Sequence, residues 1–531
     1  MIRVPLLALT KKGFAERFIE KMTDDRFSAC LLPMYWTSPL TLLVGLILTA
    51  GSVSTAEEKD AAKPKQKEPV QKESVSRDGS VTIAGAQVDY TVTTGELQLK
   101  NDKGEDQATI FHVSYVKKGV KDVSSRPVLF AFNGGPGSSA VWLHLGALGP
   151  KIIPTSADGT KALAPPITVV ENPQSILDVA DLVFVDPVAT GLSRPESKDK
   201  SKQFFGVQGD LDSMSDFIRR WITQHKRWSS PKFVLGESYG SLRAAGLSDK
   251  LQQRYGMHLN GVILLSGLLD YRTLMASQGN DLSYAVFLPS LAATAHFHGK
   301  IKGDRDAIVK DAREFAATTY RTALYRGHTI DDATKQKIAT KLSELTSLDP
   351  QWIIDNHLRI SSTKFRKQLL KSEGKVLGRF DARVAWDAID TASDYPNYDP
   401  SYSVVHGPIS TAMLDYLGRD LGWKDERVYE ILTGKVHPWN WNANNSYVNL
   451  SGSIANALKH NPKLRILVQC GHTDLATAAG GILYSIDHLM LPKAQRSNIK
   501  TAWYDAGHMF YLNQPDLEKM RKDLVSFITE K

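Results

Sequence analysis

Residues 232–240 read KFVLGESYG, an apolar run followed at once by a serine flanked by glycines. A strand that reverses into a helix within a few residues has no room for side chains two positions before and after the turn. Glycine is therefore needed at Gly236 and Gly240, and the hydroxyl of Ser238 stands at the tip of the turn. The stretch 241–247 that follows is compatible with a helix. This context predicts a nucleophilic serine rather than a chance match to the pattern Gly-x-Ser-x-Gly.

A serine hydroxyl is a weak nucleophile until a base takes its proton, so the chain should also supply a histidine and a carboxylate. His508 follows a short apolar run and a glycine late in the chain, which is the setting of a base on a loop at a sheet edge. Asp474 lies between the serine and the histidine, just past an apolar run, and is expected to orient the imidazole. Asp505 is a rival acid, but it stands on the same short segment as His508. The order serine, acid, histidine is that of the α/β-hydrolase arrangement.

The rest of the chain predicts a mostly parallel sheet covered by helices. Runs that are apolar on both faces belong to parallel strands buried between helices, and here they are 128–132, 182–185, 233–235, 262–265 and 464–468. Alternating patterns indicate an antiparallel edge formed by 80–83, 87–93 and 108–116. Helical patterns replace this rhythm between about residues 274 and 434, and an insertion there would cover the carboxyl edge of the sheet as a cap. We predict an α/β-hydrolase catalytic domain over residues 80–531 with this helical cap inserted.

The N-terminal region has the pattern of an export signal. Residues 40–50 are apolar but too few to cross a bilayer, and small residues ending at Ala56 follow them. We expect residues 1–56 to be a signal peptide. The residues before Met34 do not resemble the start of a signal peptide, and a mis-assigned start, with translation beginning at Met34, is one explanation. The alternative to a signal peptide is an uncleaved anchor. Residues 57–79, rich in Lys, Glu, Pro and Gln, are expected to be a disordered linker. The mature protein is therefore predicted to be secreted or periplasmic, without stable membrane insertion.

Composition narrows the choice of partners and cofactors. The net charge of +8 is modest and no block of Lys or Arg accompanies it, so no nucleic-acid partner is expected. Cleavage near Ala56 would remove Cys30 and leave Cys470 as the single cysteine, which cannot form an internal disulfide. His296 and His298 have a weak metal-like spacing that is more typical of a surface pair. We expect neither a metal nor another cofactor.

A glycine-rich loop is the candidate for part of the oxyanion hole. An oxyanion hole needs two backbone N–H groups aimed at one point. Tyr239, directly after the nucleophile, supplies one by position, and the other should come from the loop after an earlier strand. The sequence NGGPG at 133–137 follows the apolar run 128–132 in that place. A phosphate-binding loop is the wrong interpretation, because no Lys followed by Ser or Thr comes after it.

Taken together, these motifs resemble the serine carboxypeptidases of the α/β-hydrolase fold. The resemblance lies in the order and spacing of FNGGPGSS at 132–139, NPQS at 172–175, DPVATGLS at 186–193, GESYG at 236–240, GHTD at 471–474 and GHM at 507–509. It extends from about residue 80 to the C-terminus and is faint in the cap. Eukaryotic members usually have a cysteine at the position of Ser138 and several disulfides; this chain has neither, and is similar to a bacterial-type member.

The resemblance implies a serine-type carboxypeptidase that acts on peptides with a free C-terminus through an acyl-enzyme. It places the oxyanion between the amides of Gly135 and Tyr239, and it implies that the substrate carboxylate is bound by Asn133, Gly134 and Glu237. Glu237 can hydrogen-bond a carboxylate only when protonated, because two bare carboxylates in a closed site repel each other. Acidic conditions should therefore favour peptide binding.

Several alternatives stay open at this point. An esterase or acyltransferase would use the same triad of Ser, Asp and His, and a catalytically silent binding protein would have the same fold. Two aromatic clusters, at 280–284 and 437–441, would either line a substrate pocket or pack in the core.

Overall fold

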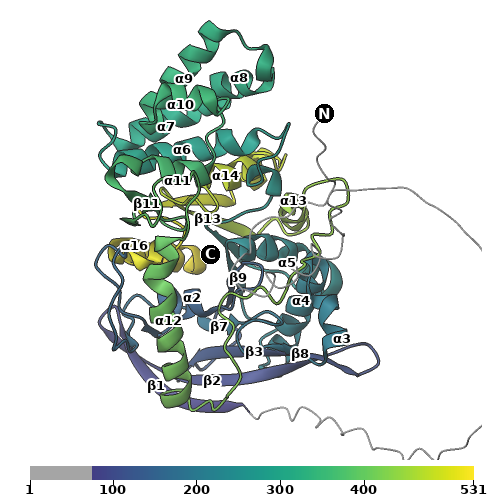
Figure 1. The fold of residues 1–531 in the computed structure, drawn as a ribbon. Helices are drawn as coiled ribbons and strands as arrows, with labels where there is room; N and C mark the ends of the chain where they lie inside the picture. The colour runs from purple at the N-terminus through teal and green to yellow at the C-terminus, as the bar shows by residue number, and fades with distance from the viewer. Residues whose placement is uncertain (1–73, 531) are drawn as a thin grey trace, which may run out of the picture. The chain divides into compact units, whose positions relative to one another are not determined.

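The computed structural model describes residues 74–530. Within them a ten-stranded mixed sheet has the order β1-β2-β3-β7-β4-β9-β10-β13-β14, and β8 pairs with β3 (Figure 1). The expected signal peptide, 1–56, and most of the expected linker lie outside the described residues. Strand β1 begins at Val75, so the assignment of residues 75–79 to the linker is wrong. Antiparallel pairing with β2, from Val75 opposite Thr94 onward, orders these residues despite their polar composition.

The antiparallel edge predicted from the alternating patterns is present and longer than expected. It consists of β1 (Val75–Ile83), β2 (Ala86–Lys100) and β3 (Asp106–Lys117), with the short β8 (Arg194–Pro195). Strand β3 joins this edge to the parallel part by pairing antiparallel with β7. A separate two-stranded antiparallel sheet is formed by β5 (Lys151–Ile152) and β6 (Val170–Glu171).

Six strands form the parallel part of the sheet. They are β4 (Val128–Phe132), β7 (Asp181–Val185), β9 (Lys232–Glu237), β10 (Gly261–Leu265), β13 (Arg465–Gly471) and β14 (Ile499–Tyr504). Every residue of β4, β7, β9 and β10 is buried, as expected for runs that are apolar on both faces. Strand β14 was not among the predicted strands, because it is the edge strand and most of its residues are partly or fully exposed.

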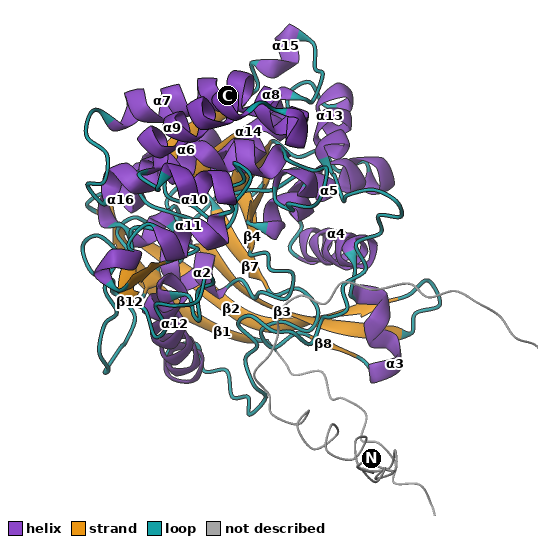
Figure 2. Ribbon diagram, turned by 45° about the horizontal axis from the view of Figure 1, so that its top comes forward, coloured by secondary structure: helices purple, strands orange, loops and turns teal. Residues whose placement is uncertain are grey.

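Helices cover both faces of the sheet (Figure 2). Alternate residues of one strand enter opposite cores: Leu235 of β9 lies in one hydrophobic cluster and Val234 in the other. The cluster that contains Val234 also holds residues of α4 (Val207–Gln224), α5 (Tyr239–Tyr255), α13 (Ser451–His460) and α14 (Ala479–Asp487). The opposite cluster holds residues of α2 (Val141–Leu143), α12 (Pro400–Arg419) and α16 (Gln514–Thr529). Two further helices, α3 (Lys198–Ser201) and α15 (Lys493–Arg496), are single turns.

The inserted region has a hydrophobic core of its own. Its helices are α6 (Leu282–Phe297), α7 (Arg305–Phe315), α8 (Arg321–Arg326), α9 (Asp332–Thr346), α10 (Pro350–Asp355) and α11 (Ser362–Gln368). Asp349 caps α10 by accepting from the Trp352 amide, and Pro350 is its first residue. The insertion also contains a hairpin, β11 (Lys375–Leu377) with β12 (Ala385–Asp387), which the helical pattern did not indicate. Helix α12 lies in the same range of sequence but packs into the core of the sheet.

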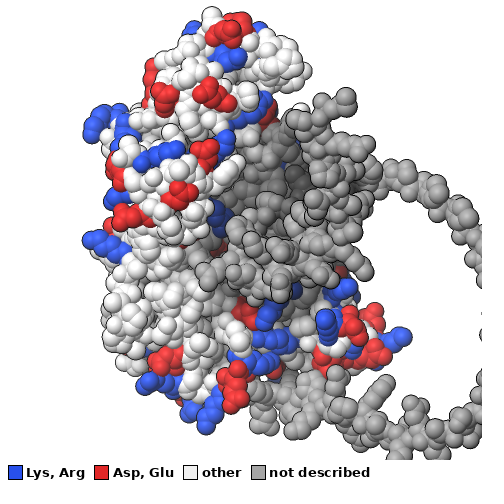
Figure 3. Space-filling view, in the orientation of Figure 1, with Lys and Arg blue, Asp and Glu red and all other residues white. Residues whose placement is uncertain are grey.

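Two surface features bear on partners. On the face shown in Figure 3, acidic and basic side chains are intermixed over the inserted helices, so the visible part gathers no patch of one sign. Within residues 74–530 no helix combines the length and the apolar character that crossing a bilayer would require.

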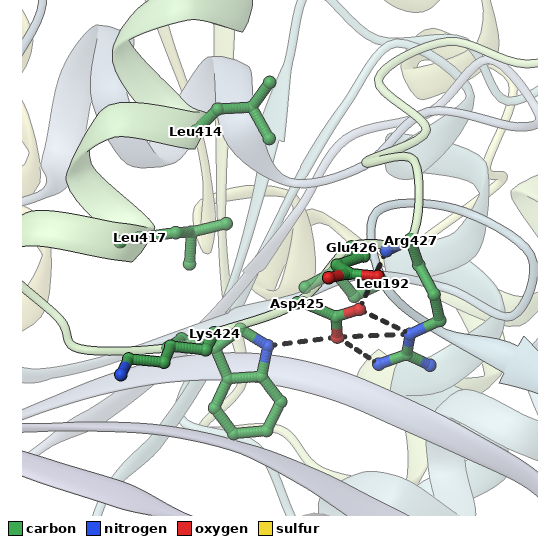
Figure 4. A pocket seen from close by; sticks show the side chains of 9 residues that line it. Leu192, Leu414, Leu417, Lys424, Asp425, Glu426 and Arg427 are labelled. Carbon is green, nitrogen blue, oxygen red and sulfur yellow. Dashed lines mark hydrogen bonds and ion pairs between the residues drawn. The ribbon is translucent and has the colours of Figure 1, made fainter.

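A cavity of about 700 Å³ lies beside α12 and the loop that follows it (Figure 4). The Asp425 carboxylate on this loop accepts hydrogen bonds from the Trp423 indole, at 3.3 Å, and from the Arg427 guanidinium, at 2.5 Å. Arg427 also pairs with Glu96 of β2. These contacts fasten the loop to the sheet. None of the site residues predicted from the sequence lines this cavity. They lie at or shortly after the carboxyl ends of β4, β9, β13 and β14.

Candidate active site

Ser238 sits on the sharp turn between β9 and α5. Its backbone has φ 62° and ψ −126°, a strained conformation typical of a nucleophile elbow. A Cβ atom added at Gly236 would lie 1.9 Å from the carbonyl oxygen of Gly240, and one added at Gly240 would lie 2.8 Å from the carbonyl oxygen of Phe132. The need for glycine at both flanks is therefore confirmed. The Ser238 amide donates to the carbonyl of Leu265 at 3.0 Å, which ties the turn to the end of β10.

His508 and Asp474 form a buried pair. The imidazole Nδ1 and the carboxylate Oδ2 are 2.8 Å apart, and the two residues are 2% and 1% exposed. Burial by itself would lower the pKa of His508, but the charge and hydrogen bond of Asp474, together with the charge of Glu237, outweigh burial and raise it. The imidazole is thus held in an environment that stabilises its protonated form.

The loops that carry Ser238 and His508 meet at the end of β10. Leu265, the last residue of this strand, accepts the Ser238 amide, and the hydroxyl of the next residue, Ser266, donates to the carbonyl of His508 at 2.6 Å. Strands β9, β10, β13 and β14 are consecutive neighbours in the sheet, and Ser238, Asp474 and His508 each follow the carboxyl end of one of them. The structure therefore brings the three residues to one sheet edge.

Thr477 is a member of this cluster that sequence reasoning missed. The Asp474 Oδ1 atom accepts the amides of Ala476 and Thr477 at 2.7 and 2.9 Å, while the Thr477 hydroxyl lies 3.0 Å from both Asp474 Oδ2 and His508 Nδ1. Both carboxylate oxygens are consequently held in fixed positions. The signal available in the sequence was an aspartate followed three residues later by a threonine, a pattern typical of local capping turns.

Asp505, the rival acid, and His472, a second histidine near the acid loop, both have other partners. Asp505 pairs with Arg305 of the insertion at 2.5 Å, and its side chain is 68% exposed. His472 is stacked on Trp503, with ring centroids 4.8 Å apart, and burial lowers its pKa to about 4. Neither contact involves the imidazole of His508.

The glycine-rich loop after β4 packs directly on the elbow. A Cβ atom added at Gly134 would lie 2.5 Å from the amide nitrogen of Tyr239, so this close approach requires glycine. Gly135 has φ 95°, a conformation that disfavours other residues. Arg243 of α5 fixes the loop. Its guanidinium donates to the carbonyl of Asn133 at 2.5 Å and pairs with Asp210 of α4 at 2.8 Å. Arg243 is fully buried, and no sequence motif indicated its role.

Glu237 lies in a closed, partly polar environment beside the nucleophile. Its Oε2 atom accepts a hydrogen bond from the Tyr511 hydroxyl at 2.8 Å, and the Asn133 side chain also bonds it. Burial raises the pKa of Glu237 to about 7, against the opposing effects of His508, Tyr511 and Asn133. A carboxyl group that is neutral over part of the ordinary pH range therefore stands next to Ser238.

The residues of the two aromatic clusters and the histidine pair at 296 and 298 make contacts within the protein. Trp439, from the cluster at 437–441, packs edge-on against Tyr239 with ring centroids 5.6 Å apart. Asp281, from the cluster at 280–284, pairs with Arg359 at 2.6 Å. His296 and His298 each bond a backbone carbonyl, those of Gly303 and Ala382 respectively, so the two imidazoles are turned to different partners.

A segment of the insertion reaches the candidate base. Phe380 is stacked on the His508 ring, with centroids 5.2 Å apart, and its carbonyl accepts the His508 amide at 2.5 Å. The adjoining residues bind the acid loop as well, since the Ala382 amide donates to the carbonyl of Thr473. The insertion thus helps to hold both loops that follow β13 and β14.

The fold and these contacts define the class: the chain is an α/β-hydrolase with a helical insertion. Residues 87–514 match the family model for serine carboxypeptidases. The chain therefore belongs to the serine carboxypeptidase family.

Two relatives match part of the chain, and one solved structure shares its fold. The chain is 27% identical over 178 residues to Serine carboxypeptidase-like 16 of Arabidopsis thaliana, covering 32% of this chain and 38% of the plant protein. It is 27% identical over 191 residues to the Lysosomal protective protein of Mus musculus, covering 36% of this chain and 35% of the mouse protein. The matches thus span little more than a third of these relatives. The crystal structure of Kex1(Δ)p, a prohormone-processing carboxypeptidase from Saccharomyces cerevisiae, has the same fold, with a TM-score of 0.51 and 16% sequence identity. The match covers 83% of this chain and 91% of the yeast chain.

Proposed function

We propose that the chain is a serine-type carboxypeptidase, which removes residues from the free C-terminus of peptides or proteins. The observation that carries the proposal is the buried Glu237 carboxyl, which adjoins Ser238 and has a pKa raised to about 7 by burial. A protonated carboxyl in that place can donate a hydrogen bond to the terminal carboxylate of a peptide. Membership of the serine carboxypeptidase family supports the same reading.

The proposed reaction passes through an acyl-enzyme. Ser238 Oγ bonds to the carbonyl carbon of the last peptide bond while His508 takes the hydroxyl proton, and the amides of Gly135 and Tyr239 hold the resulting oxyanion. The C–N bond then breaks, and His508 passes its proton to the departing amine. Water attacks the ester, His508 takes a water proton, and the proton returns to Ser238 as the acid is released. Asp474 keeps the imidazole oriented throughout.

The clamp distinguishes a carboxypeptidase from an esterase or acyltransferase with the same triad. We assign it to Asn133, Gly134 and Glu237. The Asn133 side-chain oxygen accepts the Leu143 amide at 3.3 Å, which leaves the side-chain NH₂ as a donor. Two donors and a close-packed glycine then surround the place where a terminal carboxylate would lie.

Removing one donor should separate the two activities. In an Asn133→Ala variant we expect kcat/KM for a free-carboxyl peptide to fall about 10- to 100-fold, because a hydrogen bond to a charged group is lost. Hydrolysis of the matching peptide amide should change by less than about threefold, since the amide has no carboxylate to bind. Mass spectrometry of stepwise C-terminal shortening measures both rates. Equal losses on the two substrates would contradict the clamp and favour the esterase.

A catalytically silent binding protein is tested by labelling. A fluorophosphonate should modify Ser238 in the native chain and fail to modify a Ser238→Ala variant, because the reagent reacts with an activated serine. Ser266→Ala is not a suitable control, since its hydroxyl holds the His508 loop. Ser393, on a loop of the insertion, is a suitable control. The Ser393→Ala variant should be labelled as the native chain is. An unlabelled native chain would support the binding protein.

We further propose that the protein is exported as a bacterial-type member of the family, with 1–56 as its signal peptide and a linker that ends before β1. The apolar stretch 40–50 supports export. Ser138, at the position where eukaryotic members usually have cysteine, supports the bacterial type. The N-terminal residue of the mature protein, determined by sequencing after expression with the signal, should lie near residue 57. A mature chain that retains residues 40–50 would favour the anchor instead.

A further inference from the structure

We propose that Tyr511 determines which oxygen of the Glu237 carboxyl carries the proton, and thereby aims the Glu237 hydroxyl at the substrate carboxylate. The inference rests on the proposed function of Glu237 in the clamp and adds a positioning residue to it.

Tyr511 is held rigidly against Glu237. Its hydroxyl donates to Glu237 Oε2 at 2.8 Å, and the residue is 1% exposed. The ring packs on Gly146, where an added Cβ would lie 2.9 Å from a ring carbon, and edge-on against Phe510 at 6.1 Å. Tyr511 lies in the single helical turn Phe510–Leu512, immediately after His508 and Met509. The turn that follows the candidate base thus delivers the phenol to the candidate clamp.

The hydrogen bond has a consequence for the proton. A neutral carboxyl group has one carbonyl oxygen, which accepts, and one hydroxyl, which donates. The pKa of Tyr511 is raised well above its ordinary value by burial and by the Glu237 charge, so the phenol keeps its proton and acts as a donor. A phenol that donates to Oε2 favours the form in which Oε2 is the carbonyl oxygen. The proton is then carried by Oε1.

The orientation of the Asn133 side chain is fixed as well. Its amide orientation is set by the Leu143 amide, which donates to the side-chain oxygen at 3.3 Å. The NH₂ group is therefore turned away from α2 and available to Glu237 and to a ligand. With Tyr511 on Oε2 and the Asn133 NH₂ fixed, the Glu237 hydroxyl and the Asn133 NH₂ are two donors whose directions are preset for one carboxylate.

Removal of the phenol should have two opposite effects on peptide binding. In Tyr511→Phe the Glu237 proton is no longer directed to Oε1 and the carboxyl loses the contact that orients it, so KM for a free-carboxyl peptide at pH 5 should rise about two- to tenfold, the range for a lost hydrogen bond between neutral groups. The phenol also stabilises the ionised form of Glu237, so its loss raises the pKa of that carboxyl. The pH at which KM begins to climb should therefore move upward. Replacing a residue that only supports the fold would not produce both effects, a weaker binding of the peptide at low pH and a binding that persists to higher pH.

The experiment measures KM and kcat from pH 5 to 9 for one peptide and for its C-terminal amide, with native protein, Tyr511→Phe and Tyr320→Phe. Tyr320 is the matched control, a buried phenol of the insertion that donates to the Leu358 carbonyl at 2.6 Å. We expect Tyr320→Phe to follow the native profile, and the amide to show neither effect in any variant. Suppose that native protein prefers the peptide to its amide. A dependence of KM on pH that is the same in Tyr511→Phe as in native protein would then overturn the role of Tyr511. Equal losses on peptide and amide without a shift of the profile would overturn it too. Native protein without preference for the peptide would instead refute the proposed function.

Discussion

Replacing Asp474 with asparagine is expected to lower kcat about 10⁴-fold with little change in KM, the magnitude known for the equivalent substitution in serine proteases. The contacts of the carboxylate explain why an isosteric change should be so costly. Oδ1 accepts the amides of Ala476 and Thr477, so in the variant the carboxamide oxygen must take that position. The NH₂ group is then left facing His508 Nδ1. Nδ1 would have to accept, which places the imidazole proton on Nε2 and removes the base that Ser238 requires.

Asp505→Asn is the matched control for this prediction. Asp505 is the rival acid of the sequence, yet its side chain is mostly exposed and pairs with Arg305. An exposed ion pair contributes little, so activity should stay within about threefold of the native value. Steady-state kinetics on one peptide measures both variants, and circular dichroism checks that Asp474→Asn is folded. Comparable activity of native protein and Asp474→Asn, or a large loss in Asp505→Asn, would reverse the assignment of the acid.

The second large effect is a dependence of peptide binding on pH. Burial raises the pKa of Glu237 to about 7, so this carboxyl is neutral and donates below that pH, and is ionised and repels a peptide carboxylate above it. If only the neutral form binds, KM for a free-carboxyl peptide should be flat below pH 7 and rise about tenfold for each pH unit above it. At pH 9 the increase would be on the order of 100-fold.

The peptide amide separates this effect from the titration of the base. The pKa of His508 is raised, so protonation of the imidazole lowers kcat/KM on the acid side for peptide and amide alike. Above pH 7, in contrast, only the peptide should lose binding. Glu237→Gln should remove the rise, because a glutamine cannot ionise and presents its NH₂ where the protonated carboxyl presents its hydroxyl. A KM that is equally flat for native protein and Glu237→Gln would exclude Glu237 as a ligand of the carboxylate.

Much of the candidate site was visible in the sequence because its parts depend on local backbone constraints. At Gly236 the steric reason acts within five residues, because an added Cβ would lie 1.9 Å from the carbonyl oxygen of Gly240. At Gly240 the contact, at 2.8 Å, is with the carbonyl oxygen of Phe132 on β4, so the structure adds a tertiary reason for this glycine. Runs apolar on both faces likewise identify buried parallel strands wherever they occur. The sequence did not indicate the edge strand β14 or the polar start of β1. At the edge of a sheet, hydrogen bonds to the neighbouring strand order residues that show no pattern of hydrophobic residues typical of a strand.

Apart from Thr477, which binds Asp474 three residues away, the residues that sequence reasoning missed act across large separations in the chain. Arg243 holds the Asn133 carbonyl from 110 residues away, and Tyr511 reaches Glu237 across 274. Phe380, from an insertion without a recognisable motif, is stacked on His508. No local pattern distinguishes such an arginine, tyrosine or phenylalanine from an ordinary core residue, since its partner is specified by packing alone.

The sequence by itself determined the nucleophile turn, the order of the triad candidates and the parallel character of the sheet, because steric limits and hydrophobic periodicity act over a few neighbouring residues. Only the tertiary structure decided that His508 Nδ1 faces Asp474 Oδ2 and that the Tyr511 hydroxyl donates to Glu237 Oε2. Hydrogen-bond direction depends on where distant strands end and how their loops pack, and these positions are fixed only when the whole sheet has formed.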